Sequence, residues 1–184
     1  ITDGTLSTMN GDDRWPDVVA RRLYAQHGNR IGVVNAGIGG NQIAGPAAYA
    51  PDRPFPGGPS ARMRIDRDVL SLSGIGAMIW LEGINDFSKN GNASVEKVTE
   101  RLKEVVAYIR GKRPDIRLIG ATVTSALGSS NANHGFPEQD EKRKALNTFI
   151  RTSKLFDDVV EFDAAVLDPA TGGMKAEFIP DSTT

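Results

Sequence analysis

The sequence of 184 residues contains no cysteine, and this absence excludes a disulfide framework, a thiol nucleophile and a cysteine-based zinc site. The formal net charge is only −1, which provides no electrostatic argument for binding nucleic acid or an anionic membrane surface. No apolar run approaches the roughly 20 residues that a membrane-spanning helix needs. We therefore expect no nucleic-acid partner, no membrane partner and no bound metal.

The composition is that of an ordinary globular protein, with 39% hydrophobic and 24% charged residues. This length suits one domain with a sizeable core, and no internal repeat divides it, so residues 1–184 are expected to form a single domain. The first residue is Ile rather than Met, so any signal peptide would lie upstream. A secreted or periplasmic location is compatible with this sequence, and the compartment and the oligomeric state stay open.

Helical and extended segments alternate along the chain, which predicts βαβ units around a parallel sheet. Helices are expected where apolar residues recur at helical spacing behind a capping residue or a proline, over residues 13–26, 61–72, 94–110 and 138–153. Strands are expected where short apolar runs end in glycine or polar residues, over residues 30–35, 77–81, 116–123 and 159–162. The proline-rich segment 42–60 and the Gly- and Asn-rich segment 125–137 are expected to be loops.

Two of the expected strands end in loops with a distinctive set of residues. Glu82 and then Gly83-Ile84-Asn85-Asp86 follow one strand, and Asn35-Ala36-Gly37-Ile38-Gly39-Gly40-Asn41 closes the other. An Asn at the carboxyl edge of a sheet presents an amide donor where α/β enzymes bind their ligands. Each loop taken singly is also common turn chemistry. A dinucleotide fingerprint starting at Gly37 would need a glycine where Gln42 stands.

Together with the start of the chain, Ile1-Thr2-Asp3-Gly4, these two segments resemble the SGNH (GDSL-type) serine hydrolases. The resemblance extends over nearly the whole chain in the order and spacing of the segments. It implies an α/β fold, a three-layer α/β/α flavodoxin-like architecture with a parallel sheet of order 2-1-3-4-5. The first strand of that sheet would be missing from these residues. The resemblance also implies a serine esterase that needs no cofactor.

The resemblance assigns roles to four residues of this chain. The backbone N–H of Gly40 and the side-chain amide of Asn85 would belong to the oxyanion hole, while Asn35 and Asp86 would order their loops by hydrogen bonding. The nucleophilic Ser would directly precede Ile1, and an Asp-x-x-His block would follow Thr184. The catalytic triad would therefore lie outside these residues.

A catalytic triad needs a histidine, and the sequence contains two, His27 and His134. His27 ends the first expected helix beside Gly28, which is typical of a helix-end cation or a solvated residue. His134 lies in the loop after the expected strand 116–123, where it could line a substrate cleft. Neither is expected to be the triad base.

The sequence thus predicts a carboxylic ester hydrolase that acts on small-molecule or carbohydrate esters, with acetyl groups on sugars among the candidates. One alternative is a non-catalytic carbohydrate- or ligand-binding module of the same fold. Another is a flavodoxin-like ligand-binding domain, for which both the Asn35–Asn41 and the Gly83–Asp86 segments would have to arise by chance.

Overall fold

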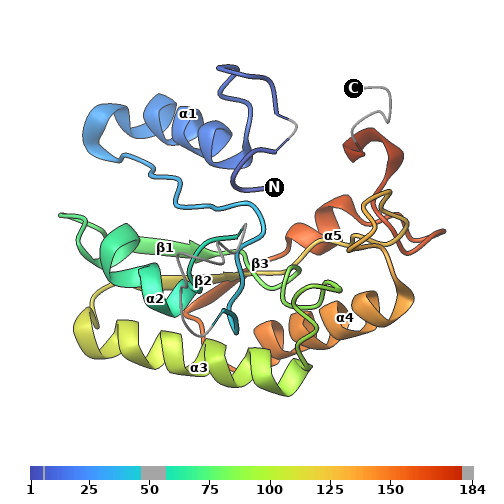
Figure 1. Cartoon of the computed structure of the whole chain (residues 1–184). Coiled ribbons are helices and arrows are strands. Elements are labelled where there is room, and N and C mark those ends of the chain that lie inside the picture. Colours follow the sequence, from blue (N-terminus) through green and yellow to red (C-terminus); the bar gives the residue numbers. More distant parts are fainter. Residues whose placement is uncertain (6, 47–56, 180–184) are drawn as a thin grey trace. The chain divides into compact units, whose positions relative to one another are not determined.

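The computed structural model describes residues 1–5, 7–46 and 57–179 of the chain (Figure 1). The chain forms two compact units, residues Ile1–Gly40 and Asn41–Thr184, which we call the N-terminal and the C-terminal unit. The proline-rich part of the predicted loop, residues 47–56, and the last residues, 180–184, lie outside the described residues.

The N-terminal unit is built around helix α1, Trp15–His27. Pro16 lies in the first turn, where its missing N–H costs nothing. The carboxylate of Asp17 accepts hydrogen bonds from the backbone N–H of Arg14 at 3.1 Å and from its guanidinium Nε at 2.6 Å, which satisfies the helix start. A short 3-10 turn, Gly28–Arg30, follows the helix. The helix predicted over residues 13–26 is confirmed.

The prediction of a strand over residues 30–35 is wrong. Arg30 ends the 3-10 turn, and residues 31–36 have no regular secondary structure. The backbone at Ile31 is extended, with φ −129° and ψ 120°, yet among residues 1–5, 7–46 and 57–179 no segment forms a ladder with it. Val34 is accordingly 67% exposed. β-branched residues favour an extended backbone, but only a hydrogen-bonded neighbour makes that backbone part of a sheet.

The C-terminal unit holds a parallel three-stranded sheet of order β1-β2-β3. Its strands are β1, Ala77–Trp80, β2, Arg117–Ala121, and β3, Asp158–Val160. Met78 lies opposite Leu118, and Gly120 lies opposite Val159. All three strands were predicted within a few residues. Their order matches the last three positions of the expected order 2-1-3-4-5.

Helices connect and cover these strands. Helix α2, Ala61–Ile65, continues directly into a π-helical turn, η2, Asp66–Leu70. The two long helices are α3, Val95–Lys112, and α4, Pro137–Thr152. The hydroxyl of Ser94 accepts a hydrogen bond from the backbone N–H of Lys97, so the predicted cap of α3 is confirmed. The short helix α5, Phe162–Val166, and the 3-10 turn η3, Ala176–Phe178, were not predicted.

The hydrophobic core of the C-terminal unit lies where α3 and α4 cover one face of the sheet (Figure 1). Helix α3 contributes the apolar stripe that its sequence periodicity predicts, and the sheet and α4 supply the residues facing it. The most deeply buried residues of this core are Ile43, Val98, Leu102, Val105, Ile109, Ile116, Leu118, Leu146 and Ile150. Within the described part of the chain, no helix is long and apolar enough to cross a membrane.

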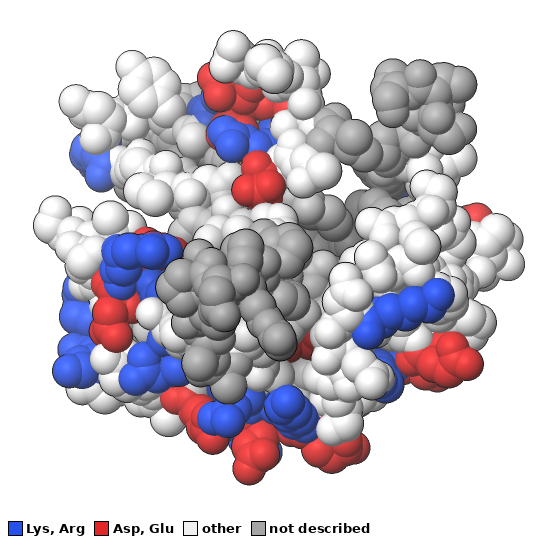
Figure 2. Space-filling model, viewed as in Figure 1, with Lys and Arg blue, Asp and Glu red and all other residues white. Residues whose placement is uncertain are grey.

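Charged side chains of both signs lie side by side on the surface of the C-terminal unit near α3 (Figure 2). Arg101 and Glu104 of that helix form an exposed ion pair at 2.6 Å. This mixture agrees with the net charge of −1 and gives this face no strong field of one sign.

Candidate active site

The Gly83–Asp86 loop follows β1 at the carboxyl edge of the sheet, as predicted. It closes as a tight turn in which the backbone N–H of Asp86 donates to the carbonyl oxygen of Gly83 at 3.2 Å. Gly91 packs against the far side of this turn, and a Cβ there would collide with the carbonyl oxygens of Asn85 and Asp86. The loop is therefore held by backbone packing that leaves no room for a side chain at position 91.

The side-chain amide of Asn85 is fixed by a contact with Asn41. Its Nδ2 donates to the backbone oxygen of Asn41 at 2.9 Å. An amide nitrogen carries two hydrogens, so this contact uses one of them. Gln42 adds a second link, because its Nε2 donates to the backbone oxygen of Asn85 at 3.3 Å. The orientation of the Asn85 amide is therefore set by the chain itself.

Asn41 is itself firmly held, which makes it a stable support for Asn85. It is 3% exposed, and its Nδ2 donates to the backbone oxygens of Gly57 at 2.6 Å and Pro59 at 2.7 Å. Its Oδ1 accepts from Nε of Arg64 in α2 at 2.8 Å. The glycine-rich segment thus ends in a buried Asn whose side chain is fully hydrogen-bonded.

Asp86 ties its loop to the segment that follows Asn41, within the C-terminal unit. Its carboxylate is fully buried and accepts the backbone N–H groups of Ile43 at 2.9 Å and Ala44 at 2.7 Å. Burial raises the pKa of Asp86 to about 6, although these two hydrogen bonds act in the opposite direction. We expected Asp86 to order the loop of Asn85. Its side chain instead orders the segment that follows Asn41, while its backbone oxygen accepts from Ala93.

The N-terminal unit contains Asn35 and Gly40, the remaining residues to which the family resemblance assigns a role. Asn35 orders its own loop as predicted, because its Nδ2 donates to the backbone oxygen of Thr2 at 2.6 Å and its Oδ1 accepts from the N–H of Gly37 at 2.8 Å. Gly40, the last residue of this unit, has φ of +80°, a conformation that favours glycine. His27 lies at the end of α1, as predicted.

Glu82 is a residue of the site region that sequence reasoning missed. It is separated from the end of β1 only by Leu81, and burial raises its pKa to about 8, with Arg64 opposing this rise and the nearby Asp86 adding to it. Its Oε1 is buried and has no hydrogen-bond partner among the described residues. The available signal was a charged residue placed directly after the expected apolar strand, residues 77–81.

We expect Glu82 to make the folded protein less stable as pH rises from about 4.5 to about 8. In that window the folded state keeps a proton on Glu82 that the unfolded state has released, so the free energy of unfolding falls with rising pH. The free energy of unfolding should fall by a few kcal/mol, in proportion to the difference between the pKa of Glu82 in the folded and in the unfolded state. Glu82→Gln, which imitates the protonated acid, should remove this slope and be more stable than the parent at pH 9. Urea unfolding at pH 6 and pH 9 measures it.

The matched control for that prediction is Glu100→Gln on the exposed side of α3. This variant should keep the slope of the parent protein. If the free energy of unfolding of the Glu82→Gln variant falls with pH as steeply as that of the parent, Glu82 does not hold a proton in the folded state.

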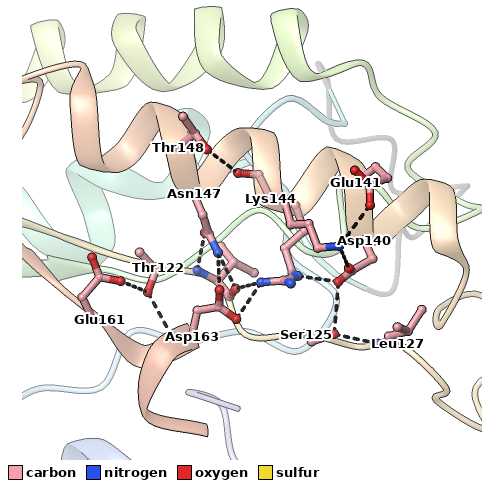
Figure 3. A network of polar contacts seen from close by, with 12 residues as sticks. Thr122, Ser125, Leu127, Asp140, Glu141, Lys144, Asn147, Thr148, Glu161 and Asp163 are labelled. Atoms are coloured by element: carbon pink, nitrogen blue, oxygen red, sulfur yellow. Dashed lines mark hydrogen bonds and ion pairs between the residues drawn. The ribbon is translucent and has the colours of Figure 1, made fainter. Parts of the chain in front are cut away.

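A buried ion-pair network lies where the chain leaves β2 (Figure 3). Arg143 of α4 is 1% exposed and contacts Asp140 through Nε at 2.7 Å and Asp163 through Nη1 at 2.7 Å. Nη1 also donates to the backbone oxygen of Val123 at 2.9 Å. Figure 3 shows Asp140 of α4 and Asp163 of α5 beside the segment after β2 that holds Ser125. The charges of the network therefore hold a loop at the carboxyl edge of the sheet.

The rest of the network satisfies the backbone of that loop. The side chain of Asn147 accepts from the N–H of Val123 at 2.7 Å and donates to its carbonyl oxygen at 2.9 Å. The hydroxyl of Ser125 donates to Asp140 at 3.1 Å. Burial alone would raise the pKa of Asp140, but the contacts with Arg143, Lys144 and Ser125 outweigh it and lower the pKa.

His134 lies in the loop between β2 and α4, as predicted. Its ring is half-buried, and Nδ1 lies 2.7 Å from Nε2 of Gln139. Burial lowers the pKa of His134. Residues 1–5, 7–46 and 57–179 contain no group of three His, Asp or Glu side chains that could hold a metal ion.

Comparison with known proteins identifies the family of this chain. The family model of the GDSL-like lipase/acylhydrolase family matches residues 1–182. The chain therefore belongs to the GDSL-like lipase/acylhydrolase family, a family of carboxylic ester hydrolases. No curated protein matches the sequence.

Two solved structures show the same fold. A carbohydrate acetylesterase from Sinorhizobium meliloti matches with a TM-score of 0.63 and 14% identity, over 85% of this chain and 73% of that one. An inhibitor-bound aryl esterase from M. smegmatis matches with a TM-score of 0.61 and 14% identity, over 95% of this chain and 81% of that one. These likenesses confirm the flavodoxin-like α/β fold of the SGNH hydrolases.

Proposed function

We propose that this protein is a serine esterase that removes small acyl groups, such as acetyl groups, from hydroxyl-bearing substrates including carbohydrates. The observation that carries the proposal is the Asn85 amide after the carboxyl end of β1, oriented by a buried Asn41, with a second hydrogen that no described residue accepts. The polar loop between β2 and α4 lies against the same segment and supports a hydroxyl-bearing substrate. The carbohydrate acetylesterase among the similar structures points to the same substrate class.

The proposed reaction is acyl transfer through a covalent intermediate. The hydroxyl oxygen of a Ser directly before Ile1 attacks the ester carbonyl carbon, and a His beyond Thr184, oriented by an Asp, takes the hydroxyl proton. The negative charge that develops on the carbonyl oxygen is stabilised by the N–H of Gly40 and by Nδ2 of Asn85. The alcohol leaves with the proton, and water then releases the acid by the same route.

The two compact units are, in this proposal, parts of one catalytic domain spanning residues 1–184. A single hydrolase domain accounts for a family match that runs through both units.

A fluorophosphonate probe tests the proposal directly on the full-length protein. An activated serine displaces fluoride from the probe, and peptide mass spectrometry locates the adduct. We expect one adduct, on the Ser immediately before Ile1, and none in a sample unfolded beforehand with urea. The absence of an adduct on folded protein would contradict the serine mechanism and favour a non-catalytic binding module of the same fold.

A further inference from the structure

Gln139 joins the loop that carries His134 to the segment that carries Asn85. It is 4% exposed, and its Nε2 donates to the backbone oxygen of Ile84 at 3.2 Å. Its Oε1 accepts from the backbone N–H of Gly135 at 2.9 Å. A carbonyl oxygen can only accept and an N–H can only donate, so these two backbone contacts fix which end of the amide is which.

The orientation of Gln139 also fixes the hydrogen on the ring of His134. Because Nε2 of Gln139 is a donor, the ring nitrogen Nδ1 at 2.7 Å accepts the hydrogen bond and carries no hydrogen itself. In the neutral ring the single N–H is then on Nε2. The chain therefore holds His134 as the tautomer that donates through Nε2.

A second, independent contact joins the loop of His134 to the chain that follows the Gly83–Asp86 loop. The backbone N–H of Lys89 donates to the carbonyl oxygen of Asn133, the residue before His134, at 3.1 Å. The loop is also ordered internally, since the N–H of His134 donates to the carbonyl oxygen of Asn131 at 2.9 Å. Among the described residues, the ring of His134 has its side-chain hydrogen bond through Nδ1 to Gln139, and none accepts from its Nε2.

An oriented donor that no described residue engages, linked through Gln139 to the residue before Asn85, has a definite use in an esterase. We propose that the Nε2–H of His134 donates a hydrogen bond to a hydroxyl oxygen on the alcohol portion of the ester and so makes the enzyme select hydroxyl-bearing substrates. Gln139 is the positioning residue that keeps His134 in the donating tautomer. This inference rests on the proposed esterase function and adds a determinant of its substrate class.

The test compares two esters that differ only in hydroxyl groups, glycerol monoacetate and propyl acetate. Replacing His134 with Phe removes the donor and keeps an aromatic ring. A neutral hydrogen bond contributes enough that we expect the ratio of kcat/KM for the glycerol ester over the propyl ester to fall roughly three- to tenfold. The matched control is His27→Phe, which changes the other histidine and should leave the ratio at the parent value.

A second variant, Gln139→Glu, tests the tautomer. A carboxylate in that position accepts a hydrogen from Nδ1, so the neutral ring would carry no hydrogen on Nε2, while the protonated ring would carry one on each nitrogen. The ratio of kcat/KM for the two esters should then fall as pH rises through the pKa of His134 in this variant and stay constant in the parent. NMR titration of the two histidine rings gives that pKa directly, with His27 as internal reference.

The outcomes separate the inference from the function on which it rests. If the parent protein hydrolyses neither ester, the proposed function fails and the inference fails with it. If the parent hydrolyses both, and folded His134→Phe and Gln139→Glu variants keep the parent ratio at every pH, the esterase stands and the role of His134 is wrong. A lower ratio in His134→Phe, or a pH-dependent ratio in Gln139→Glu, supports the inference.

Discussion

Asn85→Ala is expected to lower kcat/KM for p-nitrophenyl acetate by about 10²–10³-fold, because removal of one oxyanion donor typically has an effect of this size. The structure adds a smaller expected effect on stability. The same amide donates to the backbone oxygen of Asn41, so the free energy of unfolding should fall by about 1 kcal/mol. Asn41 keeps its contacts with Gly57, Pro59 and Arg64, and the loop should therefore keep its conformation. Initial rates and urea unfolding of the same samples measure the two effects.

Two further variants make this prediction specific. Asn85→Asp keeps the shape of the side chain but offers only acceptors, so it should be at least as inactive as the alanine variant. Asn90→Ala, which changes an exposed Asn of the same region, should stay within about twofold of the parent. Unchanged turnover in a folded Asn85→Ala variant would show that Asn85 is not an oxyanion donor.

Arg143→Met is expected to lower the free energy of unfolding by about 3–5 kcal/mol, because breaking a buried ion pair leaves uncompensated charges in the interior. Arg143 contacts both Asp140 and Asp163, and those carboxylates are almost as buried as Arg143 itself. Lys144 stays at 2.9 Å from Asp140, so the larger part of the loss should come from Asp163. Urea unfolding at pH 7 measures the difference.

The control for this prediction makes the same substitution in an exposed ion pair. Arg101→Met removes a partner of Glu104 on the surface of α3 and should change stability by less than about 1 kcal/mol. Adding Asp163→Asn to the Arg143→Met variant should restore part of the lost stability, since it removes one unpaired charge. A loss of stability in Arg143→Met no larger than in Arg101→Met would show that the network contributes little.

Local signals in the sequence predicted much of this fold. The apolar stripe and the cap at Ser94 predicted α3, and the short apolar run before Gly83 predicted β1. The strand predicted over residues 30–35 was wrong because a sheet needs a neighbour in space, and the local sequence does not state whether one is present. The helix α5 is only five residues long, and so short a helix has almost no periodicity to detect.

The candidate site, like the fold, could be predicted only in part from the sequence. The Asn and Gly residues of the two predicted segments stood out because their types and spacing match a known family. The buried polar face of α4 did not, although Asp140, Arg143 and Asn147 recur at helical spacing. Charged residues at that spacing ordinarily indicate a solvated face. Only their partners, contributed by the ends of β2 and α5, make them interior residues.

The ion-pair network at the end of β2 also affects how the protein should respond to heat. The hydration of charged groups becomes less favourable as temperature rises, so the cost of burying Arg143, Asp140 and Asp163 decreases on warming. The hydrophobic contribution of the core reaches a plateau over the same range. The loop that these charges hold should therefore stay attached to the sheet up to the temperature at which the whole C-terminal unit unfolds.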